Sequence, residues 1–254
     1  MISMADQPPV RKPDNKKLRI DPFTWGWWLY LGITVLLIVL MTIFLKNKPR
    51  SVRLTFMFWY SVFQLAYLMV YKYSLRYYRY NFSMWNELPL YLCNLSSIIS
   101  IIASGFDIHF LQSYCLTLGT AGALLAFLMP DGPNVNLPFF SLNTLGFYGY
   151  HAILLATCIG YFTTGLCVPE FREIPLILLT ILGCLLLAHI VNTILRKTGI
   201  LPTANYIFTY RADNPVLGAS YKLLPHRFIY LLPLFIPGSV LVALMIGLFR
   251  LISR

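Results

Sequence analysis

Seven apolar stretches, each about as long as a membrane is thick, make up most of this sequence. A membrane-spanning helix needs about 20 apolar residues, because the hydrocarbon core is about 30 Å thick and a helix rises about 1.5 Å per residue. Hydrophobic residues form 58% of the 254 residues and charged residues only 11%, which excludes a water-soluble globular protein. We therefore expect an all-α fold, a polytopic bundle of seven transmembrane helices. The predicted spans are 27–45, 54–71, 88–104, 110–129, 142–165, 174–195 and 228–249.

The charged residues predict how the chain is oriented. Residues 1–26 form a polar, basic tail that lacks the apolar core of a cleaved signal peptide, and residues 27–250 form one transmembrane domain. With seven spans, one membrane face carries 13 Lys and Arg residues and the other carries seven. The positive-inside rule then places the N-terminus in the cytoplasm and the C-terminus outside. The net charge of +11 requires no nucleic acid partner, because basic residues beside apolar spans anchor to anionic lipid.

A polar segment, Glu87-Leu-Pro-Leu-Tyr-Leu-Cys93-Asn94, marks the start of the third predicted span. In the expected topology this span begins on the cytoplasmic side, with Cys93 roughly 8 Å into the helix. His151 of the fifth span lies about 13 Å from the same side. Polar groups at membrane depth are unfavourable and often mark a functional site. The other polar candidates in this half of the membrane are Glu87, Asn94, Asp131, His189, Asn192, Asn205 and Tyr206.

Helix packing offers a second interpretation of several of these residues. Cys93 belongs to a stripe of small residues with Ser97, Ser100 and Ser104, and such stripes let membrane helices approach closely. A cysteine in this position commonly acts as a small apolar residue. His151 equally fits a hydrogen bond to a backbone carbonyl group. Two further residues, His189 and Asn192, fit interhelical hydrogen bonds.

The catalytic alternative pairs the thiol of Cys93 with the imidazole of His151. A buried thiol is mostly protonated, and a neighbouring imidazole can take its proton and leave a nucleophilic thiolate. Such a thiolate can attack the acyl ester of a membrane lipid and form a thioester. Water or a lysolipid hydroxyl then accepts the acyl group from this thioester. The amide of Asn94, Asn192 or Asn205 would orient the histidine or donate to the oxyanion.

Other chemistries have less support in the sequence. The five cysteines lack the paired spacing of a zinc or redox site, and only Cys115 with Cys167 is a pair to consider for a disulfide. There is no HExxH motif, no phosphate-binding glycine loop and no GxSxG elbow. We expect no metal and no cofactor. A small-molecule transporter or ligand receptor remains the alternative function, because the same polar cluster could line a substrate path.

The order of the motifs resembles a known family. The polar segment up to Asn94 is followed by Gly119-Thr-Ala-Gly122, Met129-Pro-Asp131, Tyr150-His151, Asn192 and Asn205-Tyr206. Over roughly residues 85–235 this arrangement is similar to that of the YwaF-like bacterial membrane proteins, relatives of eukaryotic transmembrane protein 164. The bacterial pattern usually has histidine where this chain has Tyr91, which excludes a metal-binding or basic role at this position.

The resemblance implies a seven-helix lipid acyltransferase of the bacterial cytoplasmic membrane. Its substrates would be membrane phospholipids and lysophospholipids, between which acyl chains move without acyl-CoA. The family's cysteine falls on Cys93, which would carry the acyl group. Its histidine falls on His151, which would assist the transfer. The oligomeric state is left open.

Overall fold

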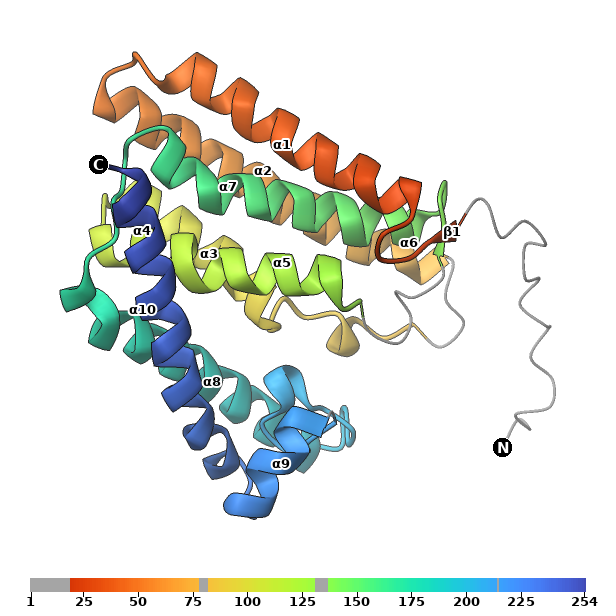
Figure 1. Ribbon diagram of the computed structural model, residues 1–254. Coiled ribbons are helices and arrows are strands. Elements are labelled where there is room, and N and C mark those ends of the chain that lie inside the picture. Colours follow the sequence, from red (N-terminus) through yellow and green to blue (C-terminus); the bar gives the residue numbers. More distant parts are fainter. Residues whose placement is uncertain (1–18, 78–81, 131–136, 214) are drawn as a thin grey trace.

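The computed structural model describes residues 19–77, 82–130, 137–213 and 215–254, and nearly all of their regular structure is helical (Figure 1). The helices of at least six residues are α1 (Trp25–Leu45), α2 (Arg50–Ser74), α3 (Leu92–Gly105), α4 (His109–Tyr114), α5 (Thr120–Leu128), α7 (Tyr150–Thr163), α8 (Ile174–Lys197), α9 (Pro215–Leu223), η10 (Ile229–Leu234) and α10 (Phe235–Ile252). The shorter helical segments are η3 (Leu75–Tyr77), η4 (Met84–Asn86), η5 (Cys115–Gly119), α6 (Leu142–Thr144), η7 (Leu145–Gly149), η8 (Phe171–Glu173) and η9 (Tyr206–Phe208). Two short strands, β1 (Arg19–Ile20) and β2 (Leu137–Pro138), pair antiparallel.

Six helices in the described part of the chain are long and apolar enough to cross a membrane. These helices cover Trp25–Leu45, Arg50–Tyr77, His109–Leu128, Leu142–Thr163, Phe171–Lys197 and Ile229–Ile252. They confirm the prediction of an all-α membrane protein.

The structure does not confirm the predicted count of seven transmembrane helices. The expected span over residues 88–104 contains only α3, which has 14 residues. At 1.5 Å per residue α3 is about 21 Å long, shorter than the hydrocarbon core of about 30 Å. The residues between Glu87 and Tyr91, including Pro89, are not helical, so the helix begins four residues later than predicted.

Helix α7 forms the centre of the bundle and lies beside α1 and α2 (Figure 1). In the helix Leu142–Thr163, 72% of the residues in its most apolar stretch of 18 residues are buried. In the helix Ile229–Ile252 the corresponding share is 17%. Glycine permits part of this packing, because a Cβ atom at Gly146 would lie 2.0 Å from the ring of Tyr71. The close approach of Tyr71 at Gly146 therefore requires a residue without a side chain at this position.

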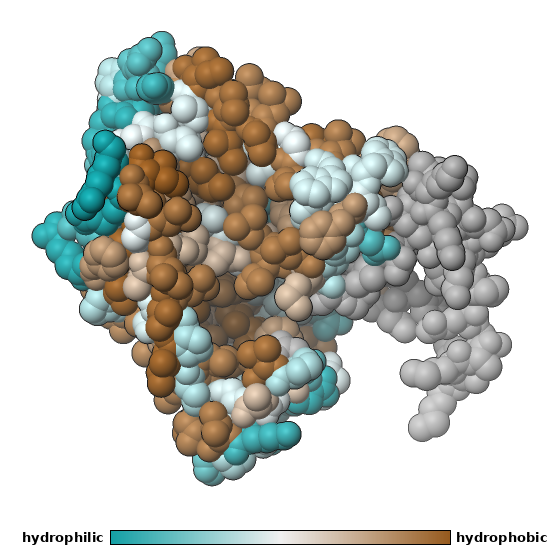
Figure 2. Space-filling model, viewed as in Figure 1, coloured by the Kyte–Doolittle hydropathy of each residue, from teal (hydrophilic) through white to brown (hydrophobic). Residues whose placement is uncertain are grey.

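The outer helices present apolar side chains at the surface. Figure 2 shows these side chains over the outward faces of the helices, while hydrophilic residues gather mainly near the helix ends. On α10, for example, Leu244 and Leu251 are 67% and 68% exposed. An apolar surface of this extent is unfavourable in water and is what a lipid environment requires.

Candidate functional site

Cys93 is the second residue of α3, at the end that follows the polar segment. The backbone of Tyr91 is extended, and its carbonyl oxygen accepts the first hydrogen bond of the helix from the N–H of Leu95, at 2.9 Å. The Cys93 side chain is partly exposed. A Cβ atom at Gly122 on α5 would lie 3.7 Å from its Sγ atom. The thiol therefore lies at a helix N-terminus and beside a residue that has no side chain.

Buried hydrogen bonds tie the backbone at Cys93 to α7 and α2. The hydroxyl of Tyr150 donates to the carbonyl oxygen of Cys93 at 2.8 Å, and it lies 2.7 Å from Oγ of Ser97. Because the Tyr150 proton is used, Ser97 donates in the second bond. Gln64 Nε2 donates to Ser97 Oγ at 2.6 Å, and Thr157 Oγ1 donates to Gln64 Oε1 at 2.8 Å. Two helices, α2 and α7, thus hold the start of α3.

His151 follows Tyr150 in α7 and is 8% exposed. Its Nδ1 atom lies 2.8 Å from the carbonyl oxygen of Phe147, and a carbonyl oxygen only accepts. Nδ1 therefore carries a proton, and in the neutral ring Nε2 carries the lone pair. The imidazole centroid is 5.1 Å from that of Tyr150 and 4.6 Å from that of Phe147. The backbone hydrogen bond that the sequence left as one of two alternatives for His151 is present.

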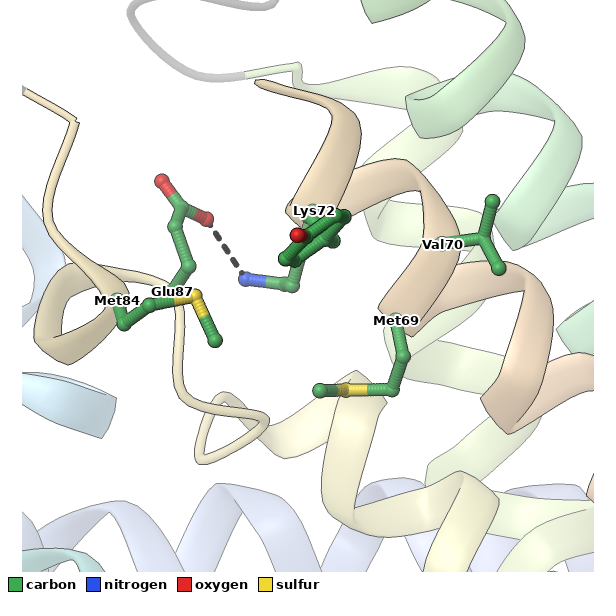
Figure 3. Close-up of a pocket in the computed structure, with 6 residues that line it drawn as sticks. Met69, Val70, Lys72, Met84 and Glu87 are labelled. Carbon is green, nitrogen blue, oxygen red and sulfur yellow. Dashed lines mark hydrogen bonds and ion pairs between the residues drawn. The ribbon is translucent and has the colours of Figure 1, made fainter. Parts of the chain in front are cut away.

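Glu87 forms a buried ion pair with Lys72 on α2. The Nζ and Oε2 atoms are 3.0 Å apart, and the two side chains are 10% and 15% exposed. Figure 3 shows this pair at a pocket of about 340 Å³, with Met69 and Met84 beside it. The pocket lining comprises Met69, Val70, Lys72, Tyr73, Met84 and Glu87, and does not include Cys93 or His151.

Tyr91 lies between this ion pair and Tyr206. The Nζ atom of Lys72 is 5.7 Å from the ring centroid of Tyr91. The rings of Tyr91 and Tyr206 meet edge to face, with their centroids 5.3 Å apart. The Tyr206 hydroxyl donates to the carbonyl oxygen of Trp85. Burial raises the pKa of Tyr206, so this hydroxyl keeps its proton.

Asn192 and Asn205 organise the loop that follows α8. Asn192 Nδ2 donates to the carbonyl oxygen of Tyr206 and to Oγ1 of Thr209, both at 2.9 Å, while its Oδ1 accepts from the Tyr206 N–H at 2.9 Å. Asn205 Nδ2 donates to the Arg211 carbonyl oxygen at 3.0 Å and to Asp213 at 2.8 Å. These bonds occupy the Nδ2 donors of both asparagines within the loop. The two amides are therefore not free to donate to an oxyanion in this arrangement.

The remaining predicted site residues lie apart or outside the described residues. Asn94 is 5% exposed and follows Cys93 in α3. His189 on α8 stacks on Tyr210, with ring centroids 5.1 Å apart, and its buried Nδ1 has no hydrogen-bond partner among the residues that the structure describes. Asp131 lies outside the described residues.

Neither a disulfide nor a metal cluster is present among the described residues. All five cysteines are free, so the disulfide considered between Cys115 and Cys167 is not formed. Ser113 Oγ lies 3.3 Å from Cys167 Sγ. In the part of the chain that the structure describes, no group of three or more His, Cys, Asp or Glu side chains could hold a metal ion.

Lys72 is a further buried charged residue near Cys93 that the sequence motifs do not mark as a candidate, although the sequence contains a signal for it. Lys72 belongs to an aromatic and basic run that is typical of a membrane interface, yet it is 8% exposed. It follows Ser61 and Gln64 at spacings that place all three on one face of α2, and all three are buried. A lysine on the same helical face as a buried serine and glutamine indicates an internal partner.

Comparison with known proteins identifies the family. Among curated proteins and among solved structures, none matches this chain. The model of the TMEM164 family matches residues 22–248, from before α1 into α10. This chain is therefore a membrane protein that belongs to the TMEM164 family.

Proposed function

We propose that this protein is a membrane-embedded lipid acyltransferase in which Cys93 is the nucleophile and His151 the general base. Its substrates are a phospholipid, which donates an acyl chain, and a lysophospholipid, which accepts it. The observation that carries the proposal is the TMEM164 family match over residues 22–248, which include both Cys93 and His151. Within the fold, a 2.8 Å hydrogen bond from Tyr150 to the backbone carbonyl oxygen of Cys93 brings α7, the helix that also carries His151, against the start of α3.

Cys93 lies in the first turn of α3, at the N-terminus of the helix. The first N–H groups of an α-helix have no partner within the helix, and Tyr91 provides no side-chain cap for α3. Their partial positive charge stabilises a thiolate near the helix N-terminus. The same N–H groups can donate to the oxyanion that forms when an ester carbonyl is attacked. Gly122 leaves space beside the sulfur atom.

The tautomer of His151 favours a basic role. Its Nδ1 proton is held by the Phe147 carbonyl oxygen, so Nε2 is the nitrogen that can accept a proton. A backbone acceptor also fixes the ring orientation. General bases typically contribute about 10²- to 10⁴-fold to a rate.

The reaction has two steps. In the first step Nε2 of His151 takes the Cys93 proton, and the thiolate attacks the ester carbonyl carbon of the donor lipid. The ester C–O bond breaks, the imidazolium protonates the leaving alkoxide, and a lysophospholipid departs from the thioester on Cys93. In the second step His151 deprotonates the acceptor hydroxyl, which attacks the thioester. The C–S bond breaks, and the proton on the imidazolium returns to Cys93. With water as the acceptor, the same steps constitute a hydrolase.

The membrane placement follows from the charge distribution and the motifs. We assign the chain to the YwaF-like bacterial branch of the family, in the cytoplasmic membrane. The excess of Lys and Arg on one face supports a cytoplasmic N-terminus and an external C-terminus. Six crossings would leave both termini on the same side of the membrane. For the termini to lie on opposite sides, the segment that contains α3 has to form a seventh crossing.

Reconstitution with defined lipids tests the activity. Purified protein in vesicles, supplied with a phospholipid labelled in its acyl chain and an unlabelled lysophospholipid, should move the label to the acceptor. Cys93→Ser should abolish transfer, and His151→Gln should lower the rate by about 10²- to 10⁴-fold. Cys184→Ser is the matched control, because Cys184 is a thiol on α8 and should leave transfer unchanged.

Mass spectrometry should detect an acyl thioester on Cys93 of the wild-type protein. Transfer that persists in Cys93→Ser would refute the mechanism. A wild-type protein that neither transfers acyl chains nor forms the thioester would refute the function and favour the transporter alternative.

A further inference from the structure

The segment between Glu87 and Tyr91 has no regular secondary structure, although it leads directly into α3. The N–H of Leu90 bonds the carbonyl oxygen of Leu88 at 2.7 Å, which makes a local turn. A helix or strand would fix the backbone by a ladder of hydrogen bonds. Here the position of the segment depends on side-chain contacts with other parts of the chain.

The first set of contacts comes from α2. Lys72 pairs with Glu87 at the start of the segment and lies against the ring of Tyr91 at its end. A lysine that is 8% exposed needs a charged partner, because an isolated buried charge is strongly unfavourable. One ammonium group therefore links both ends of the segment to the same helix.

The second set of contacts comes from the loop after α8. The ring of Tyr206 packs against Tyr91, and its hydroxyl donates to the carbonyl oxygen of Trp85, just before the segment. Asn192 holds the backbone of Tyr206 through both its N–H and its carbonyl oxygen. The ring of Tyr206 is thus supported by α8 rather than by a free loop.

We propose that Lys72 and Tyr206 are positioning residues that hold Tyr91 from two separate parts of the chain. Tyr91 provides the carbonyl oxygen for the first hydrogen bond of α3, to the N–H of Leu95. Holding Tyr91 therefore fixes the first turn of the helix, which carries Cys93. An effect of this positioning on acyl transfer rests on the proposed function. Its effect on the stability of the first turn of α3 does not.

Hydrogen exchange in the full-length protein tests the mechanical part. The N–H of Leu95 exchanges when the first turn of α3 opens, so a peptide that covers residues 92–97 reports on this turn. In lipid nanodiscs Lys72→Met should raise the exchange rate of this peptide by about tenfold or more. A tenfold change corresponds to a decrease of roughly 1.4 kcal/mol in the free energy of opening of the first turn. Lys72→Arg should stay within about twofold of wild type, since a guanidinium can retain both contacts.

Two further variants separate this role from general destabilisation. Arg76 lies about one helical turn after Lys72, and its exposed side chain stacks over Tyr73 and Tyr77. Arg76→Met therefore removes a nearby positive charge and should leave the exchange rate of residues 92–97 unchanged. The double variant Lys72→Met with Glu87→Gln removes both charges of the buried pair, so it folds without an isolated buried charge. It should also show faster exchange at residues 92–97.

Steady-state kinetics test the catalytic part. A small misplacement of reacting groups can lower turnover by up to about 10²-fold, so kcat should fall by at least about tenfold in Lys72→Met while KM changes little. Wild-type exchange in both Lys72→Met and the double variant would overturn the positioning role. Faster exchange with unchanged kcat would overturn its link to catalysis. If the wild-type protein has no transferase activity, the proposed function fails, and the exchange result still decides the positioning role.

Discussion

The two ends of α3 handle polar groups in different ways. At the Gly105 end, polar side chains bond to one another. Arg50 donates to both carboxylate oxygens of Asp107, at 2.9 and 2.6 Å, and Gln112 donates to the same carboxylate at 2.9 Å. At the Cys93 end, no side chain caps the helix. At one end charged and polar side chains pair with one another, whereas at the other end the N-cap residue supplies no side-chain hydrogen bond to the helix.

The contrast extends to the cysteines. Cys167 lies near the Gly105 end and is 2% exposed. Burial raises the pKa of its thiol to about 12. Its neighbour Ser113 donates to Glu173 at 2.6 Å, where His109 Nδ1 also bonds at 2.6 Å. This histidine therefore contacts a carboxylate rather than a thiol. We infer that the saturated end stabilises the fold, and the proposed function assigns the chemistry to the uncapped end.

The largest expected effect comes from a substitution that removes the hydrogen bonds of Glu173 at the saturated end. Glu173 is 7% exposed and accepts bonds from Ser113, from His109 and from the N–H of Glu170 at 3.0 Å. Glu173→Ala leaves these donors without an acceptor and should lower the free energy of unfolding by about 2–4 kcal/mol. Chemical denaturation in detergent measures this change. Glu173→Gln, which keeps one acceptor, should lose less.

The same variants test the division of roles. Acyl transfer per folded molecule should stay at the wild-type level in Glu173→Ala, because Glu173 belongs to the stabilising end. A loss of transfer in protein of undiminished stability would contradict the comparison.

A smaller effect is expected beside the thiol. Gly122→Ala places a methyl group in ordinary contact with Cys93 Sγ, at about 3.7 Å, and should be tolerated. Gly122→Val adds bulk to the space beside the sulfur and should slow alkylation of Cys93 by a small maleimide by roughly tenfold, or about 1.4 kcal/mol. Acyl transfer should fall in parallel.

Gly183 provides the control for this change. It lies on α8, and nothing lies within 4 Å of a Cβ atom placed there. Gly183→Val should therefore leave the alkylation rate unchanged. Equal rates for Gly122→Val and wild type would show that the space beside Gly122 does not give access to the thiol.

The sequence predicts the long helices well, because apolar length is a local property. It places α3 too early, since residues 88–91 are as apolar as a helix requires, whereas their irregular backbone contacts Lys72 and Tyr206. These contacts join segments that are far apart in the chain. Hydropathy contains no information about such pairing, and this explains why Lys72 was missed.

The candidate site was predicted in part. Hydrogen bonding was the preferred interpretation for Asn192 and one of two alternatives for His151, and a hydrogen bond is present for both. The partners differ from the expectation, because Asn192 bonds the loop at Tyr206 and Thr209 rather than another helix. Residue chemistry shows that a buried amide needs partners, whereas only the folded chain determines which ones. The pairing of Cys93 with His151 stays a prediction.

The smallest expected effect concerns the pH dependence of the Gly105 end. The hydrogen bonds from Arg50 and then Gln112 lower the pKa of Asp107 below its ordinary value. A lowered pKa in the folded state means that the ionised carboxylate stabilises the fold. This contribution is complete above the unfolded-state pKa of about 3.9 and is lost as the pH falls through the folded-state pKa. Exposed ion pairs contribute about 0.2–1 kcal/mol, and these side chains are 44% and 39% exposed.

Asp107→Asn isolates this contribution. Asp107 has a φ of 51°, a conformation that asparagine also tolerates, so the variant keeps the backbone. At pH 6 its thermal midpoint in detergent should lie roughly 1–3 °C below that of wild type. The difference should shrink as the pH falls below about 4, because only the wild type loses a charge at this position. A constant difference between pH 6 and pH 3 would show that the carboxylate charge does not contribute, and the two ends of α3 would then differ in geometry alone.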